Sequence, residues 1–112
     1  METLSITSKK PFSIKCLEEI LSKHWGVEAS ADSTLVVHGG GRRCYIHPDT
    51  ESQKAEEYRL LLDYSDVELA KSLLEQIADD PGFTVDNDFG TVVSGSEFVA
   101  RCKAEAGWDW RR

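Results

Sequence analysis

The sequence contains no apolar run longer than three residues, and only three of its 112 residues are cysteines. A membrane-spanning helix needs about 20 consecutive apolar residues, and the core of a secretory signal needs about 7 to 15. We therefore expect neither, and a cytoplasmic location is the default. The cysteines are odd in number and widely spaced, which argues against a disulfide framework. We expect reduced thiols that pack as small buried residues, at Cys16, Cys44 and Cys102.

Complete catalytic and cofactor motifs are also lacking. Neither a phosphate loop G-x-x-x-x-G-K-[ST] nor a nucleophile motif G-x-S-x-G occurs. Segment 86–97, DNDFGTVVSGSE, places Asp86, Asp88 and Glu97 as a calcium loop would, but Gly90 stands where an oxygen ligand belongs. We predict a turn there, and we expect no metal, no cofactor and no catalytic residue.

The residues that are present suit one soluble core, with a hydrophobic fraction of 40% and a charged fraction of 29%. Alternating and β-branched patterns predict strands at 3–7, 34–38, 42–47, 58–64, 83–85 and 90–93. The polar segment 48–57 is predicted as a loop. For 58–64 the alternative is a helix that extends from Ser52 through YRLLL.

Three helices are predicted from their start and stop signals. The first follows the cap residue Ser13 and ends at Gly26; the second starts at a capping box of Ser65 and Glu68 and stops before Pro81. The third covers 97–106, with Ser94 as its cap and Gly107 at its end.

This order of elements predicts one α+β domain over residues 1–107, with a mainly antiparallel sheet and helices packed on one face. The nearest common arrangement is ferredoxin-like, a split βαβ unit, here with an extra hairpin and a C-terminal helix. Residues 108–112 are predicted as a C-terminal tail. A free edge strand of such a sheet allows a homodimer.

The stretch HGGGRRCYIH, residues 38–47, gathers histidines, arginines and a cysteine around three glycines. We predict a hairpin with a three-residue loop at the glycines, which pairs 38 with 42, 36 with 44 and 34 with 46. Side chains alternate across a strand, so Cys44 and His47 point to opposite faces, with His38 on the face of Cys44. These three side chains therefore do not bind one zinc ion. An alternative role is to hold an anionic ligand on the sheet, with Arg42, Arg43, Tyr45 and His47.

Negative charge is concentrated in one quarter of the chain. Residues 63–88 contain eight acids and one base, whereas the other 12 acids and 12 bases balance, so the net charge of −7 lies in this window. Such a field repels nucleic acid and anionic membranes and attracts a basic protein. A solvated face that only keeps the protein soluble is the competing interpretation. The aspartates expected to face a basic partner are Asp63, Asp66, Asp79, Asp80, Asp86 and Asp88.

The C-terminal segment GWDWRR contains two tryptophans two residues apart, Trp108 and Trp110. In an extended segment both rings lie on the same side. The favoured interpretation is that they close the end of the core. The alternative is an aromatic anchor that contacts the partner protein.

Size, charge and the missing motifs together favour a small acidic protein-binding module without catalytic activity. A bacterial immunity-type inhibitor of a basic protein fits this class. The first alternative is the anion-binding domain at the Arg42 and Arg43 hairpin, and the second is an enzyme that depends on a thiol or a carboxylate. Neither nucleic acid nor a membrane is expected as a partner.

Overall fold

The computed structural model describes residues 1–11, 13–30, 33–49 and 58–111. In these ranges the chain forms seven strands and three helices. In chain order they are β1 (Glu2–Ser8), α1 (Ile14–Ser22), β2 (Gly26–Ala29), β3 (Leu35–Gly39), β4 (Arg42–Pro48), β5 (Tyr58–Tyr64), α2 (Val67–Ile77), β6 (Phe83–Asp86), β7 (Val92–Ser94) and α3 (Gly95–Ala104).

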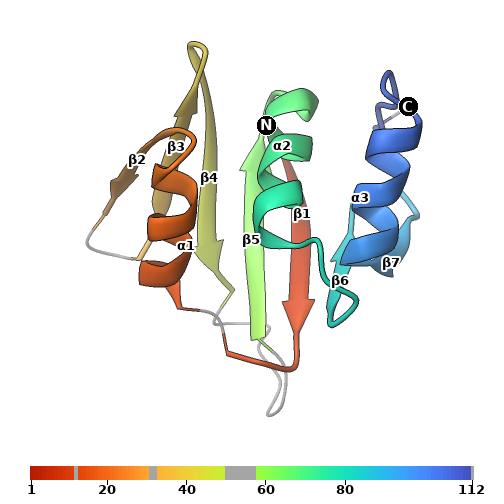
Figure 1. Cartoon of the computed structure of the whole chain (residues 1–112), viewed down its shortest axis with the longest axis horizontal. Helices are drawn as coiled ribbons and strands as arrows, with labels where there is room; N and C mark the ends of the chain where they lie inside the picture. Colours follow the sequence, from red (N-terminus) through yellow and green to blue (C-terminus); the bar gives the residue numbers. More distant parts are fainter. Residues whose placement is uncertain (12, 31–32, 50–57, 112) are drawn as a thin grey trace.

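The strands form a single antiparallel sheet in the order β2-β3-β4-β5-β1-β6-β7. Figure 1 shows α1, α2 and α3 side by side on one face of this sheet, and the extents of 35 × 35 × 23 Å fit two layers. The predicted α+β class, with a mainly antiparallel sheet and helices on one face, is confirmed. None of the helices in the described ranges is long and apolar enough to cross a membrane.

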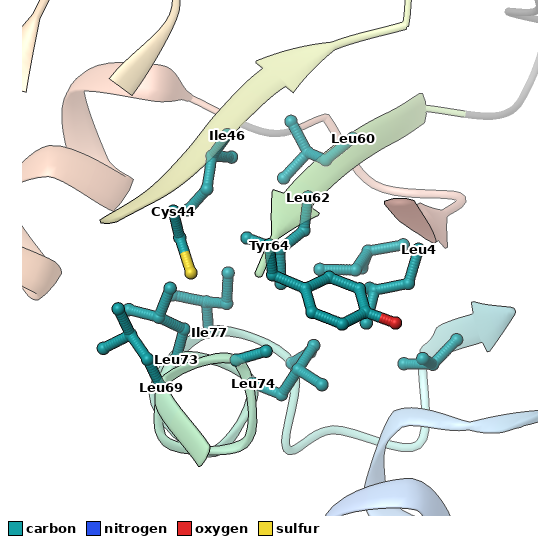
Figure 2. Packing of buried hydrophobic residues seen from close by; sticks show 14 of the residues in the cluster. Leu4, Cys44, Ile46, Leu60, Leu62, Tyr64, Leu69, Leu73, Leu74 and Ile77 are labelled. Carbon is teal, nitrogen blue, oxygen red and sulfur yellow. The ribbon is translucent and has the colours of Figure 1, made fainter. Parts of the chain in front are cut away.

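The core lies between the sheet and the helices because strand residues alternate between the two faces. In β1, Leu4 and Ile6 are buried, while Thr3, Ser5 and Thr7 are half-buried on the other side of the sheet. Figure 2 shows side chains of β1, β4 and β5 directed toward α2, where they meet residues such as Leu69 and Leu73. The opposite side of the sheet, which the described helices leave uncovered, is called the open face below.

The helices begin at side-chain caps. Ser13 Oγ accepts the backbone N–H of Cys16, and Ser94 Oγ accepts that of Glu97, as the sequence predicted for both serines. The cap of α2 is Asp66 rather than the predicted Ser65, since Asp66 Oδ1 accepts the N–H of Leu69 at 2.9 Å. A carboxylate caps well because it also interacts favourably with the helix dipole.

The β3–β4 hairpin has a two-residue loop instead of the predicted three-residue loop. Gly40 and Gly41 have φ angles of +58° and +81°, which is the backbone of a type I′ turn. The register therefore shifts by one residue, and His38 pairs with Arg43 and Val36 with Tyr45. His38 consequently lies on the open face and not, as predicted, on the face of Cys44.

Gly39 does not belong to the loop, for a steric reason. A Cβ atom at this position would lie 3.0 Å from Leu69 Cδ1 and 3.1 Å from Trp25 Cδ1. Glycine at 39 thus leaves room for two packed side chains, whereas the next two glycines provide the positive φ angles.

The ends of two helices differ from the prediction. α1 stops at Ser22, with Lys23 as its C-cap, and Gly26 begins the unpredicted edge strand β2, which pairs with β3. α3 starts at Gly95 and ends at Ala104, two residues earlier than expected at each end. β2 is held by its pairing with the next strand, β3, and four residues are too few to show a periodic pattern.

The strand predicted over 58–64 is confirmed as β5. Of the predicted loop before it, 48–57, the structure describes only the first two residues. Pro48 belongs to β4, and the backbone N–H of Asp49 donates to the carbonyl of Arg59. The rest of the predicted loop, 50–57, lies outside the described residues, as does most of the alternative helix from Ser52.

Candidate functional site

Two of the six aspartates singled out by the sequence contact side chains from other strands. Asp66 caps α2, and its other oxygen, Oδ2, lies 2.7 Å from Arg42 Nη1. Asp63, at the end of β5, accepts the hydroxyl of Thr3 at 2.6 Å and lies 3.0 Å from His47 Nε2. Their carboxylates link β1, β4, β5 and α2 through these contacts.

The contacts of Asp63 resemble part of a catalytic relay but differ from one in connectivity. In a nucleophile–base–acid arrangement the hydroxyl donates to the imidazole, and the carboxylate orients that imidazole. Here both the Thr3 hydroxyl and the His47 ring contact Asp63. The three residues therefore form a cross-strand polar cluster on the open face, which fixes the orientation of His47 without activating Thr3.

The other four aspartates lie in pairs at the two ends of β6. Asp79 and Asp80 are exposed in the connection between α2 and β6, whereas Asp86 ends β6 and Asp88 lies in the turn that follows. No ion pair joins any of these four to a cation among the described residues. β6 lies near one end of the sheet, beside β7 and α3 (Figure 1), so this end carries uncompensated negative charge.

The two pairs differ in their surroundings. Asp80 lines a surface cavity of about 330 Å³ together with Lys9 and Lys10, and these cations weaken its field. At the other end of β6, Asp86 lies opposite Val92 of β7 in the strand pairing. The more strongly negative end of β6 is therefore the β6–β7 turn, residues 86–92.

The β6–β7 turn is held in shape by a buried amide. Asn87, which is 1% exposed, accepts the N–H groups of Phe89 and Thr91 with its side-chain oxygen, at 2.8 and 3.1 Å. Its own backbone N–H donates to Thr91 O, and Asp86 Oδ1 accepts the N–H of Asp88. The predicted turn is confirmed. Asp86 and Asp88, which the calcium pattern singled out, take part in it through the Asp86 carboxylate and the Asp88 backbone.

The same turn exposes two large apolar side chains that were not predicted from the sequence. Phe89 is 45% exposed and Val92 is 61% exposed. The signal for Phe89 was present: in DNDFGT a phenylalanine stands between turn-forming residues, where the chain has little opportunity to bury it. Val92 could not be identified in this way, because its exposure depends on which face of β7 it occupies.

The four residues of the alternative anion site do not lie together. Arg43, Tyr45 and His47 alternate along β4 and share the open face, whereas Arg42 lies on the helix side and binds Asp66. His38 joins the open-face group through its pairing with Arg43. His47 is already bound to Asp63, so Arg43 and Tyr45 are the members available to a ligand.

The two tail tryptophans pack against the end of the core. Trp110 is 4% exposed, and its ring centroid lies 5.2 Å from that of Phe98. Trp108 is half-buried, and the guanidinium carbon of Arg101 lies 4.0 Å from its ring centroid. The favoured interpretation of core closure is confirmed for Trp110, and of the pair only Trp108 offers an accessible edge.

The three cysteines lie in different environments. Cys44 is fully buried, and burial, followed by the negative charge of Asp66, raises the pKa of its thiol to about 12. Cys102 is half-buried, and burial raises its pKa as well. Cys16 is exposed on α1, so the expectation of three buried cysteines is wrong for this residue.

Comparisons with models of protein families, with characterised proteins and with solved structures give no match for this chain. Within the described residues, no group of three or more His, Cys, Asp or Glu side chains is placed to hold a metal ion.

Proposed function

We propose that this chain is a small acidic cytoplasmic protein-binding module without catalytic activity, and that its partner is a basic protein. The proposal is best supported by the pair of aspartates at each end of β6, none of which has an ion-pair partner among the described residues. An immunity-type inhibitor, which neutralises a basic toxin, is one form that such a module takes. In this proposal the partner is neither nucleic acid nor a membrane, since both are anionic.

The fold has little need for the charge of these aspartates. The carboxylate of Asp86 accepts one backbone N–H within its turn, and that of Asp80 accepts the N–H of Gly82. An asparagine oxygen accepts the same bond without a charge. The negative charge is therefore available to attract a partner, and attraction between opposite fields mainly raises the association rate.

The cysteine and histidine environments support the absence of catalysis. A buried thiol with a pKa of about 12 stays protonated near neutral pH, whereas the thiolate is the nucleophilic form. His47 is held by Asp63, and the nearby Thr3 hydroxyl donates to the carboxylate. These contacts weaken the alternative of an enzyme that depends on a thiol or a carboxylate.

An anion-binding domain is the second candidate, and the hairpin register favours it in a reduced form. Arg43 and Tyr45 share the open face with His38, and an arginine beside an aromatic ring suits a carboxylate or phosphate ligand. Arg42 plays no part in this version. Titration with inorganic phosphate, monitored at the amides of β3 and β4, tests it.

Two finer structural proposals accompany this function. The ferredoxin-like arrangement is supported by the order β4-β5-β1-β6 at the centre of the sheet, in which α1 and α2 connect strands on one face. A homodimer would use one of the edge strands, β2 or β7.

The proposed function is tested by partner capture and association kinetics. Wild type, Asp79→Asn/Asp80→Asn and Asp86→Asn/Asp88→Asn are used to capture partners from lysate of the source organism, at about 0.1 M and 1 M salt, where the Debye length is about 10 Å and 3 Å. The matched control, Glu18→Gln/Glu19→Gln on α1, removes the same charge far along the chain from β6.

For a captured partner we expect the aspartate variants to associate several-fold more slowly at low salt. The α1 control should change the rate much less, and high salt should remove the difference, because screening removes long-range attraction. Equal capture and equal rates for all variants at both salts would mean that the acidic window only solvates the protein.

A further inference from the structure

We infer that the β6–β7 turn is the docking surface of the module, and that the partner inserts an apolar side chain flanked by Lys or Arg between Phe89 and Val92. The inference deepens the proposed function and rests on it. The surface consists of Asp86, Asp88, Phe89 and Val92, and is called the turn surface below.

Apolar side chains are unusually exposed at this turn. In the described part of the chain, the exposed large hydrophobic residues are Met1, Ile20, Phe89 and Val92. Two of these four lie three residues apart in one turn, whereas Met1 precedes β1 and Ile20 lies in α1. Single exposed apolar residues are ordinary, but an aromatic residue grouped with another apolar residue is typical of an interface.

The turn is already ordered before any partner binds. The buried Asn87 side chain binds the N–H groups of Phe89 and Thr91, and Asp88 and Gly90 have φ angles of +65° and +96°. A surface fixed in this way loses little conformational entropy on binding. The exposure of Phe89 therefore belongs to a defined conformation.

The charge of the turn surface determines the kind of partner that it fits. Asp86 is paired with Val92 across the two strands, and Asp88 precedes Phe89 in the chain. Neither carboxylate has a cation within ion-pair distance among the described residues. An apolar side chain that contacts Val92 therefore lies near Asp86, and one that contacts Phe89 lies near Asp88. Cationic neighbours of this side chain strengthen its binding, and acidic neighbours weaken it.

The other acidic pair lacks the apolar part of such a surface. None of the four exposed large hydrophobic residues lies beside Asp79 and Asp80, and Lys9 and Lys10 line the cavity next to Asp80. This end of β6 contributes to the long-range field. The turn surface makes the contact.

The short edge strand β7 also favours docking through side chains over docking by an added strand. β7 contains only the three residues Val92–Ser94, and Ser94 is already the cap of α3. A partner strand added to this edge would gain few backbone hydrogen bonds. The exposed side chains of the turn therefore provide most of the contact.

The experiment uses two synthetic five-residue peptides of equal charge, Lys-Leu-Lys-Leu-Lys and Lys-Ser-Lys-Ser-Lys, both blocked at their ends. Each is titrated into the full, isotope-labelled chain at low salt, and the backbone amide shifts are followed by NMR. We expect the leucine peptide to shift the amides of the turn most, and to bind roughly fivefold more tightly than the serine peptide, because it buries apolar surface.

Two variants remove the apolar part of the turn surface, Phe89→Ser and Val92→Thr, and Ile20→Ser is the matched control on α1. Both turn variants should reduce the preference for leucine to less than about twofold, while Ile20→Ser should retain it. Unchanged amide shifts outside the turn show that each variant is folded. Val92→Thr also keeps the β-branched shape that suits a strand.

The outcomes separate the surface from the function on which it rests. If both peptides bind equally and shift amides near Asp79 and Asp80 instead, the turn surface is wrong while an acidic binding function stands. If neither peptide shifts any amide at low salt, both proposals are contradicted. A preference for leucine that survives in both turn variants also overturns the turn surface.

Discussion

The indole N–H of Trp110 donates to the phenol oxygen of Tyr64 at 2.6 Å, and the two ring centroids lie 5.5 Å apart. The bond joins residues 46 positions apart in the chain and lies in the core. Its partners come from the end of β5 and from the segment that the sequence suggested as a tail. This contact fixes the C-terminal segment to the sheet.

Tyr64→Phe should destabilise the protein by about 1–3 kcal/mol, because it leaves the buried Trp110 N–H without its acceptor. The double variant Tyr64→Phe/Trp110→Phe should cost less than the two single changes together, because neither polar group then lacks a partner. Urea unfolding of the four proteins measures this coupling. Strictly additive losses would mean that the bond contributes nothing beyond packing.

Gly95→Ala should be among the most harmful single changes, although alanine is the better helix former. A Cβ atom at this first residue of α3 would lie only 1.9 Å from the carbonyl oxygen of Ala78, so the backbone must move. We expect a loss of roughly 1–3 kcal/mol or more. Gly107→Ala is the control, since a Cβ there meets nothing within 4 Å. Equal melting temperatures for the two variants would contradict the close approach of α3 to the end of α2.

Much of the sheet was predictable because its strands alternate strongly. In β5 the buried residues Leu60, Leu62 and Tyr64 repeat every second position, and α2 has a clear apolar side and a strong stop at Pro81. The hairpin register was not predictable. It depends on Gly39, whose missing side chain leaves room for Trp25 and Leu69, and those contacts arise only in the folded chain.

The candidate site was also predictable only in part, because its contacts arise only in the folded chain. The sequence shows where the acids lie along the chain, but it does not show which acids contact another side chain. Asp63 and Asp66 are bound because β4 brings His47 and Arg42 beside them, and that placement follows from the hairpin and the pairing of β4 with β5. The exposure of Val92 likewise depends on its place opposite Asp86.

Thiol labelling should distinguish the three cysteines in the native protein. Cys16 should react quickly because it is exposed, Cys102 more slowly, and Cys44 only when the chain unfolds. Mass spectrometry of the labelled peptides over time measures the three rates, and denaturant should make them similar. Rapid native labelling of Cys44 would mean that its site opens readily, and would support the thiol-enzyme alternative.

Stability should fall in alkali, and the raised pKa of Cys44 gives the direction. In the unfolded chain this thiol ionises near its ordinary pKa of 9, whereas in the fold its pKa is about 12. Between these values the unfolded state loses a proton that the folded state keeps, so the free energy of unfolding decreases by up to about 1.4 kcal/mol per pH unit. Burial also raises the pKa of Tyr64 and Cys102, which adds to the decrease. Cys44→Ala should show a shallower decrease above pH 9 in urea unfolding, and an unchanged slope would contradict this contribution of Cys44.

The division of the aspartates into bound and uncompensated groups predicts different effects on stability. Asp66→Ala removes both the cap of α2 and the ion pair with Arg42, so we expect it to destabilise the protein by about 1–2 kcal/mol. Asp79→Asn/Asp80→Asn should change stability by less than about 0.5 kcal/mol. The expected sign is stabilising, because carboxylates just beyond the C-terminal end of α2 oppose the helix dipole. The asparagine introduced by Asp80→Asn also keeps an oxygen that can accept the N–H of Gly82.

Chemical denaturation at low and high salt measures both changes. The loss from Asp66→Ala should persist at high salt, because the cap is a hydrogen bond at close range, while any gain from the double variant should fade as charges are screened. If the double variant is as unstable as Asp66→Ala, then Asp79 and Asp80 support the fold. Their charge could no longer be assigned to attracting a partner, and the acidic contribution to binding would rest on Asp86 and Asp88 at the other end of β6.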